Sequence, residues 1–301
     1  MRLIFRAVFV NVIIVHGSMS LLFHGLLRFS SYGQRFVQAI PGIKYSFFQI
    51  NSMANMIERS SENEQNERSQ ILINNLQIVK ERVIQASMSS ERNPEDVTLV
   101  AVSKTKPVSD ILALYNIGHR NFGENYFQEI VEKAKQLPSD IKWHFIGHLQ
   151  SSKASKMIRE LPNLDLLETI DSIKLASKLN NACETVGRQP LKVLVQLDTS
   201  GEDTKSGVSE SELNELVKFI LEECPYLQFS GLMTIGAPGD LSCFDRLVAA
   251  RKIVCDTFRL SEPSLQLSMG MSGDFEEAIA RGATSVRVGS TIFGERIYKK
   301  T

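Results

Sequence analysis

Cysteine is scarce in this 301-residue chain, with four residues at positions 183, 224, 243 and 255. Four are too few for a disulfide scaffold, and no two of them have the close spacing of a structural zinc site. A net positive charge is also lacking, because 34 Lys and Arg balance 34 Asp and Glu. Proteins that neutralise nucleic-acid phosphates need a basic surface, so this balance argues against that class. We expect an intracellular, reduced protein with no nucleic-acid partner, long enough for one large domain or two smaller ones.

Acidic residues are absent from the first 57 positions, which carry five basic residues: Arg2, Arg6, Arg28, Arg35 and Lys44. This segment is open to four interpretations. It fits a secretory signal with its apolar core at 7–15, a mitochondrial transit peptide, or a membrane span within the uncharged stretch 7–27. The favoured interpretation is a prefix absent from the mature protein, with translation starting at Met53 or Met56. We therefore treat residues 1–57 as an N-terminal extension and 58–301 as the folded domain. The expected compartment is the cytoplasm, and the basic, acid-free extension leaves a mitochondrial location as the alternative.

The domain alternates short β-branched runs with segments of helical periodicity. A polar stretch, 58–68, leads into a helix with apolar residues at 72, 76, 79 and 83. Strands are expected at 98–103, 119–122, 142–146, 165–170, 191–197, 227–233, 265–268 and 284–288. The helices between them are expected at 109–117, 151–160, 172–186, 209–223, 244–259 and 274–281. Eight strand–helix units predict a (β/α)8 TIM barrel, with its chemistry at the C-terminal strand ends. An open doubly wound sheet is the alternative, although GxGxxG is absent after the first strand.

A lysine closes the first expected strand. Alternation of side chains places Val100, Val102 and Lys104 on one strand face. If that face lines the barrel, the ammonium group lies partly desolvated at the mouth, where its pKa falls and the neutral amine can attack a carbonyl carbon. Lys104 is thus a candidate Schiff-base lysine, although a surface lysine at a strand end fits the pattern equally well. Lys106 precedes Pro107 and is expected outside the strand.

Two turns rich in glycine and serine follow the last two expected strands. The first contains Gly270, Ser272 and Gly273 and leads into a helix, and the second is Gly289-Ser290. Both offer backbone N–H groups and hydroxyls that suit a phosphate, and barrels often bind phosphate after strands seven and eight. The pair predicts a phosphate site, whereas either turn alone would be ordinary.

Several motifs follow one another along the chain: Leu99-Val-Ala-Val-Ser-Lys-Thr-Lys-Pro107, Phe122-Gly-Glu-Asn-Tyr126, Trp143-His-Phe-Ile-Gly147 with Leu149-Gln150, Gly231-Leu-Met233, Ser268-Met-Gly-Met-Ser272, and Val286-Arg-Val-Gly289 with Ile292-Phe-Gly294. In this order they strongly resemble the pyridoxal 5′-phosphate (PLP) homeostasis protein family. The resemblance covers about residues 68–299 and implies a barrel like the N-terminal domain of alanine racemase. One departure is Ser152, which stands where the family usually has Asn.

The resemblance also implies residue roles. Lys104 would form the internal aldimine with PLP, Arg287 would face the pyridine nitrogen, and Asn125 would line the mouth. The phosphate would be held by Ser272, Gly289 and Ser290, with Gly273 in the same turn.

These roles favour binding over catalysis. Arg287 can only donate hydrogen bonds, so the pyridine nitrogen would stay unprotonated and the ring would be a weak electron sink. We also expect no second-base domain of the kind that related racemases carry. The expected function is buffering of PLP and its delivery to apo PLP-dependent enzymes, by a monomer and without substantial catalysis. A PLP-dependent amino-acid racemase is the alternative. A Schiff-base aldolase is more remote, because Glu124 and Asp198 are the only obvious carboxylates at strand ends.

Other candidates are weaker. His144 and His148 have a spacing that suits a metal only on a helix, so we expect a packed His144, an exposed His148 and no metal. The polar stretch 198–207 is interpreted as a solvated loop, with PLP transfer through Lys205 as the alternative. Packing in or near helices accounts for the cysteines.

Overall fold

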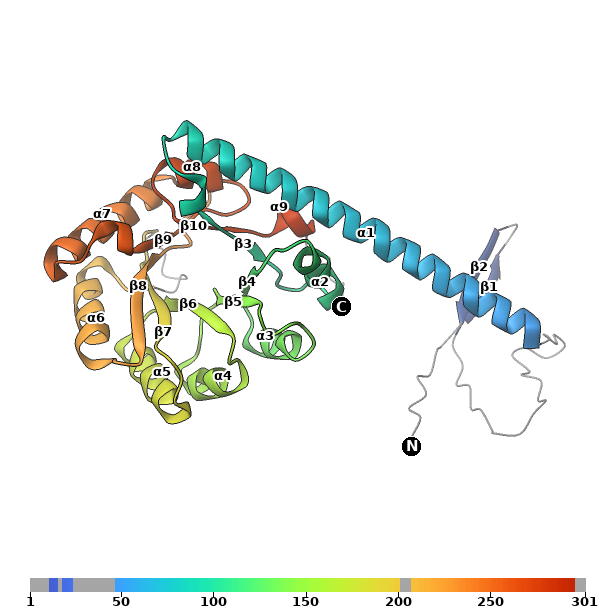
Figure 1. Ribbon diagram of the computed structural model, residues 1–301, viewed down its shortest axis with the longest axis horizontal. Helices are drawn as coiled ribbons and strands as arrows, with labels where there is room; N and C mark the ends of the chain where they lie inside the picture. The colour runs from blue at the N-terminus through green and yellow to red at the C-terminus, as the bar shows by residue number, and fades with distance from the viewer. Residues whose placement is uncertain (1–10, 16–17, 24–46, 201–206, 296–301) are drawn as a thin grey trace. The chain divides into compact units, whose positions relative to one another are not determined.

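A computed structural model describes residues 11–15, 18–23, 47–200 and 207–295 (Figure 1). The chain divides into two compact units, Met1–Asn66 and Glu67–Thr301. In the first, β1 (Asn11–Val15) and β2 (Ser18–Phe23) pair as antiparallel strands. The interpretations of residues 1–57 as signal, transit peptide, span or prefix concern a segment that lies largely outside the described residues. Within the described ranges, no helix has both the length and the hydropathy to cross a membrane.

Helix α1 (Phe47–Ser89) is longer than expected. The polar stretch 58–68, expected to precede a helix, is itself helical, because it contains no Gly or Pro and several good helix formers. In the second unit the apolar positions of α1 are buried as predicted: Leu72, Leu76 and Val79 are fully buried and Val83 is 5% exposed.

Eight parallel strands close into a barrel in the order β10-β3-β4-β5-β6-β7-β8-β9. They are β3 (Thr98–Val102), β4 (Asn121–Glu124), β5 (Lys142–Phe145), β6 (Leu164–Ile170), β7 (Leu191–Gln196), β8 (Leu227–Met233), β9 (Gln266–Ser268) and β10 (Ser285–Val288). Their bounds lie within two residues of the predicted ones. The (β/α)8 barrel is confirmed and the open doubly wound sheet was wrong.

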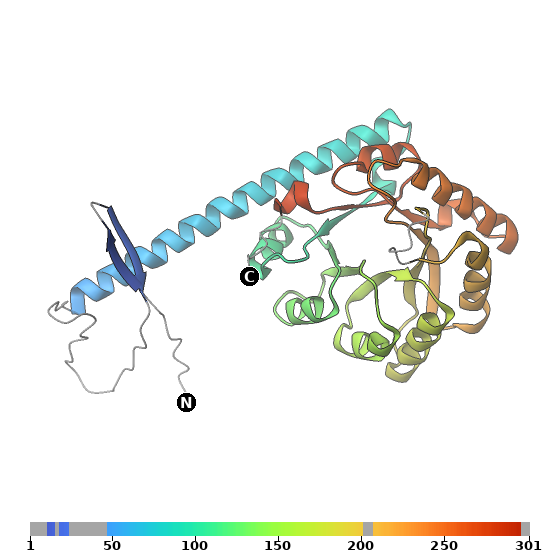
Figure 2. The ribbon, with the colours of Figure 1, turned by 180° about the vertical axis from the view of Figure 1, so that it is seen from behind.

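Helices surround the barrel strands on the outside (Figure 2). They are α2 (Val108–Asn116), α3 (Phe127–Ala134), α4 (Ala154–Glu160), α5 (Ile173–Val186), α6 (Glu210–Glu223), α7 (Ser242–Phe258), α8 (Phe275–Ala280) and α9 (Ser290–Phe293), with 3-10 turns η1 (Pro94–Asp96), η2 (Ser151–Lys153) and η3 (Glu262–Ser264). Serine caps begin two of them. Ser172 Oγ accepts from the Leu175 amide at 3.3 Å, and Ser209 forms a capping box with Glu212.

Glycine at position 123 shows which strand face looks into the barrel. A Cβ there would lie 3.0 Å from Val100 Cγ1 and 3.5 Å from Val102 Cγ2, so these three residues share one face. Their neighbours Ala101 and Phe122 belong instead to the large apolar cluster that also includes residues of the surrounding helices. Val100 and Val102 therefore point inward, and alternation places Lys104 on the same inward face.

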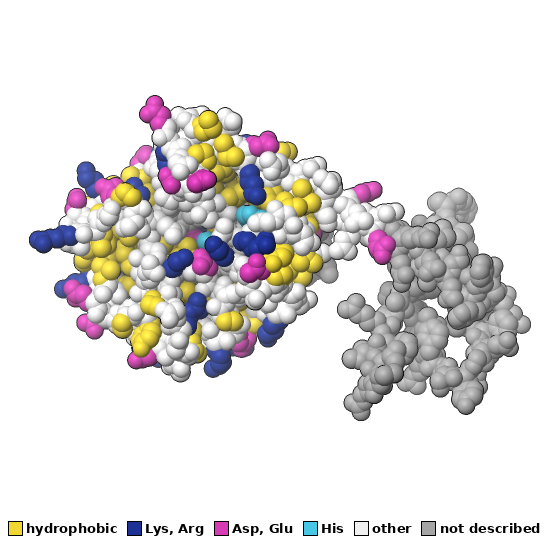
Figure 3. All heavy atoms as spheres, viewed as in Figure 1, with side chains coloured by type: hydrophobic (Ala, Val, Ile, Leu, Met, Phe, Trp, Pro, Cys, Tyr) yellow, Lys and Arg dark blue, Asp and Glu magenta, His cyan; other side chains and the backbone are white. Residues whose placement is uncertain are grey.

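The cysteines are reduced and buried, as expected. Cys183, Cys224 and Cys255 belong to the large apolar cluster. Burial raises the pKa of the Cys183 and Cys224 thiols to about 11, which keeps them protonated and unreactive at neutral pH. Acidic and basic side chains are intermixed on the face of the barrel shown in Figure 3, in keeping with the balanced charge.

Candidate functional site

The predicted site residues follow four barrel strands that are neighbours in space. Lys104 follows β3, Asn125 follows β4, Ser272 follows β9 and Gly289 follows β10. The closed sheet places these strands in the order β9-β10-β3-β4, and all their pairings are parallel. Parallel strands end on one side of a barrel, so residues from the two ends of the domain's sequence converge at a single mouth.

The turn after β3 carries Lys104, which is partly buried. The Lys106 amide donates to the Ser103 carbonyl at 3.0 Å, closing a turn around Lys104. Lys106 lies outside the strand, as predicted. Its ammonium group donates to the carbonyls of Gly294 and Glu295 at 3.0 and 2.9 Å, so it is tied to the chain that follows α9.

The two Gly/Ser turns are joined directly. The Gly289 amide donates to Ser272 Oγ at 3.1 Å. The first turn needs glycine at position 270, because its φ is +90° and a Cβ there would lie 2.6 Å from Ala278 Cβ. The Met271 amide donates to Asp274 Oδ1 at 2.6 Å, immediately before α8. Two of the other predicted phosphate residues, Gly273 and Ser290, are exposed beside this link.

Arg287 is buried inside the barrel, 4% exposed. It lies on β10 opposite Val100 of β3, on the inward face. Its Nη1 donates to Ser268 Oγ at 2.6 Å and its Nη2 donates to the Thr234 carbonyl at 2.7 Å. Burial lowers the pKa of Arg287, and the charge of Glu168 opposes this change. The guanidinium remains a cation that can only donate.

A buried carboxylate that the sequence reasoning missed completes this network. Ser268 Oγ donates to Glu168 Oε2 at 2.5 Å, and His144 Nδ1 lies 2.9 Å from Glu168 Oε1. Burial alone would raise the pKa of Glu168, but the contacts with His144, Arg287 and Ser268 outweigh it and hold that pKa below its usual value. The available signal was Glu168 in the middle of β6, on the same strand face as Leu166, whereas the other carboxylate of the strand, Asp165, lies near its start. His144 is buried as predicted, and no group of metal-binding side chains occurs among the described residues.

The two carboxylates that an aldolase would need are engaged elsewhere. Glu124 Oε1 accepts from Ser103 Oγ at 2.6 Å and from Lys133 Nζ at 2.7 Å. It alternates with Gly123 and so points out of the barrel, toward α3. Asp198 Oδ1 accepts from the amide and hydroxyl of Ser200 at 2.9 and 2.8 Å.

Asn125 leaves a polar atom without a partner at the mouth. Its Oδ1 is buried and makes no hydrogen bond to any described residue. The backbone is fixed there by close contact with the next loop, since a Cβ at Gly147 would lie 2.0 Å from the Asn125 carbonyl oxygen. An orphaned buried acceptor indicates a missing donor.

Three further predictions have mixed outcomes. His148 is exposed as predicted, with Nδ1 3.0 Å from Asp171 Oδ2. Ser152 is exposed in η2, and its effect stays a prediction. Lys205 lies outside the described residues.

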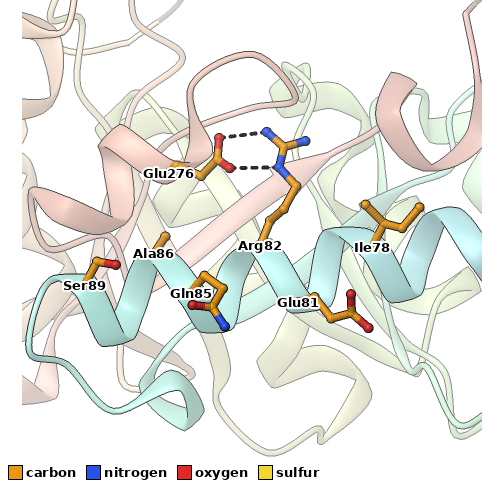
Figure 4. Close-up of a pocket in the computed structure, with 7 residues that line it drawn as sticks. All are labelled: Ile78, Glu81, Arg82, Gln85, Ala86, Ser89 and Glu276. Carbon is orange, nitrogen blue, oxygen red and sulfur yellow. Dashed lines mark hydrogen bonds and ion pairs between the residues drawn. The ribbon is translucent and has the colours of Figure 1, made fainter.

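An open pocket elsewhere is lined by residues of α1 and α8 only (Figure 4). Arg82 and Glu276 form a two-pronged ion pair across it, with distances of 2.8 and 2.7 Å. Both side chains are 39% exposed, so the pair is solvated and none of the mouth residues contributes to it.

The fold and the strand-end residues define the class of barrel found in the N-terminal domain of alanine racemase. The family model described as "Alanine racemase, N-terminal domain" matches residues 52–297. An alanine racemase from Clostridium difficile is 16% identical with a TM-score of 0.58 over 75% of this chain and 57% of its own, and shares the fold.

Relatives of higher sequence identity show which family within this class the chain belongs to. The pyridoxal phosphate homeostasis protein of Mus musculus is 50% identical over 242 residues, 75% of this chain and 87% of the relative. The pyridoxal phosphate homeostasis protein of Escherichia coli is 40% identical over 235 residues, which are 76% of this chain and 98% of the relative. The structure of PipY from Synechococcus elongatus with PLP bound is 32% identical, with a TM-score of 0.58 over 72% of this chain and all of its own. The chain belongs to the pyridoxal phosphate homeostasis protein family, as its motifs predicted.

Proposed function

We propose that this protein holds PLP through Lys104 at the barrel mouth and acts in PLP homeostasis by buffering PLP and delivering it to apo-enzymes. The convergence of Lys104, Arg287 and the linked turns of Ser272 and Gly289 at one end of four adjacent strands carries this proposal. The related PipY protein, which has been solved with PLP bound, supports it.

The residues at the mouth fit the chemical groups of PLP. Lys104 would hold the aldehyde of PLP as a C=N bond, formed by its deprotonated amine with release of one water. Ser272 and Ser290 would supply hydroxyls and Gly273 a backbone amide to the phosphate, while the Gly289 amide, which donates to Ser272 Oγ, holds that hydroxyl in place. Arg287 would donate to the ring nitrogen, and the buried Asn125 Oδ1, which has no donor among the described residues, would accept from the ring hydroxyl of PLP.

The electrostatics of the site suit storage. When bound, PLP supplies an aldehyde and an electron-accepting ring. Arg287 donates and does not protonate the ring nitrogen, so electron withdrawal is weak. Glu168 stays ionised beneath Arg287 and balances its charge. Hydrolysis of the C=N bond then returns the aldehyde and the Lys104 amine unchanged.

The recipient enzymes, a monomeric state and a cytoplasmic location are parts of the same proposal. Delivery requires that the bond to Lys104 be reversible, so that water or a recipient's lysine can release the aldehyde. A monomer leaves the mouth open to such recipients.

The test is transfer of PLP to an apo-aminotransferase, with wild-type protein compared with Lys104→Ala and with the surface control Lys156→Ala. Loaded wild type and Lys156→Ala are expected to restore the acceptor's activity, whereas Lys104→Ala, treated identically, carries no PLP to transfer. Equal transfer by Lys104→Ala would contradict the proposal. Exchange of an amino-acid α-proton with deuterium at an enzymatic rate would overturn the non-catalytic role.

A further inference from the structure

A buried lysine on α3 connects both neighbours of Lys104. Lys133 is 6% exposed and its ammonium group donates three short hydrogen bonds. They reach the Ser103 carbonyl at 2.8 Å, Glu124 Oε1 at 2.7 Å and Glu129 Oε1 at 2.6 Å. We call Lys133, Glu124 and Glu129 the Lys133 cluster.

Each carboxylate of the cluster holds one residue beside Lys104. Glu124 Oε1 accepts from the Ser103 hydroxyl at 2.6 Å, on the N-terminal side. Glu129 Oε1 accepts from the Thr105 amide at 2.6 Å, on the C-terminal side. Charge-assisted hydrogen bonds of this length are stronger than bonds between neutral groups, so the cluster fixes the chain on both sides of Lys104.

The backbone of the turn that contains Lys104 is strained at Thr105. Its φ is +64°, a left-handed conformation that is rare for a β-branched residue and that persists where surrounding contacts impose it. The bond from its amide to Glu129 is such a contact. Strain of this kind gathers at functional sites, and this one directly follows the proposed PLP lysine.

We propose that the Lys133 cluster positions Lys104 and thereby sets the rate at which PLP leaves the protein. This inference rests on the proposed function. With Ser103 and Thr105 held, the Lys104 side chain leaves the backbone in one direction and keeps its bond to PLP in place. Without these hydrogen bonds, Thr105 relaxes and the turn samples other conformations. The C=N bond then becomes more accessible to water or another nucleophile.

The experiment compares two glutamates of α3. Glu129→Ala removes the bond to Thr105 and leaves Lys133 paired with Glu124. Glu132→Ala is the matched control, since Glu132 is exposed on the same helix. Its carboxylate accepts from the Gln128 side chain and its backbone carbonyl accepts from the Gln136 side chain. Protein loaded with PLP is mixed with hydroxylamine, which takes the aldehyde as its oxime and regenerates the Lys104 amine. The loss of the visible absorption band gives the release rate, and the melting temperature of the PLP-free protein reports stability.

Glu129→Ala is expected to release PLP about tenfold faster, the factor that corresponds to one charge-assisted hydrogen bond, and Glu132→Ala at the wild-type rate. Glycine adopts φ near +64° without strain, so in a Thr105→Gly background the effect of Glu129→Ala is expected to shrink to less than about twofold. If Glu129 only stabilised the fold, Glu129→Ala would lower the melting temperature, and the Thr105→Gly background would not reduce its effect on the release rate. Lys133→Met is less suitable, because it leaves Glu124 buried without a counter-charge and endangers folding.

The outcomes separate the two proposals. Release from Glu129→Ala at the wild-type rate, with PLP still on Lys104, overturns the positioning role alone. Failure of the wild type to hold PLP on Lys104 overturns the proposed function itself.

Discussion

The Gly289 amide donates a 3.1 Å hydrogen bond to the Ser272 hydroxyl, and this bond joins the turns after β9 and β10. Because Ser272 Oγ accepts this bond, its own proton remains available to an anionic oxygen. The turns therefore hold one another in place before a phosphate arrives, which lowers the ordering cost of binding it.

Ser272→Ala is expected to weaken PLP binding about tenfold, since it removes one hydroxyl donor to a charged group and loosens the link to Gly289. Pyridoxal lacks the phosphate, so its affinity is expected to stay unchanged. Titrations of both compounds, followed by absorbance, check this. Ser264→Ala, in exposed η3, is the control, and an equal loss for PLP and pyridoxal would refute the phosphate role.

Arg287→Leu is expected to destabilise the barrel by about 3–5 kcal/mol, because it removes a buried positive charge beside Glu168 and leaves Ser268 Oγ and the Thr234 carbonyl without their donor. Arg82→Ala breaks the solvated pair of Figure 4 and is expected to cost less than about 1 kcal/mol. Urea unfolding of the PLP-free proteins measures both free energies. Similar losses for the two variants would show that Glu168 does not depend on Arg287.

His119 makes stability depend on pH. It is 6% exposed, and burial lowers its pKa to about 4. The unfolded chain takes up this proton near pH 6.5 while the folded chain does not until about pH 4, so the free energy of unfolding falls as the pH drops through that window.

Between pH 7 and 4.5 this loss is expected to reach about 2 kcal/mol in the wild type and to vanish in His119→Phe. Urea midpoints at the two pH values give the difference, with His148→Asn as the exposed-histidine control. The pKa of Glu124 is raised by burial and acts in the opposite sense, but it is common to all three proteins and cancels in the comparison. An unchanged pH dependence in His119→Phe would rule out this origin.

The sequence predicted the barrel and its mouth well because both depend on local signals. Buried parallel strands have a β-branched composition, and the functional residues directly follow strands, so finding β3 and β10 also located Lys104 and Gly289. The motifs then assigned roles to them.

The supporting contacts could not be predicted because they depend on how the barrel closes. Glu168 meets Ser268 across 100 positions of sequence, and only strand order and register bring them together inside the barrel. The left-handed conformation of Thr105 had no signal, since sequence reasoning assigns such positions to glycine. The extent of α1 was missed because the polar stretch 58–68 has helical propensity without an apolar stripe.

Attachment of PLP to Lys104 is tested most directly by borohydride reduction of the PLP-loaded protein, followed by peptide mass mapping. We expect a visible absorption band that disappears on reduction and a stable adduct on the peptide containing Lys104. The absence of a band, or an adduct on another lysine, would contradict the assignment of Lys104 as the residue that holds PLP.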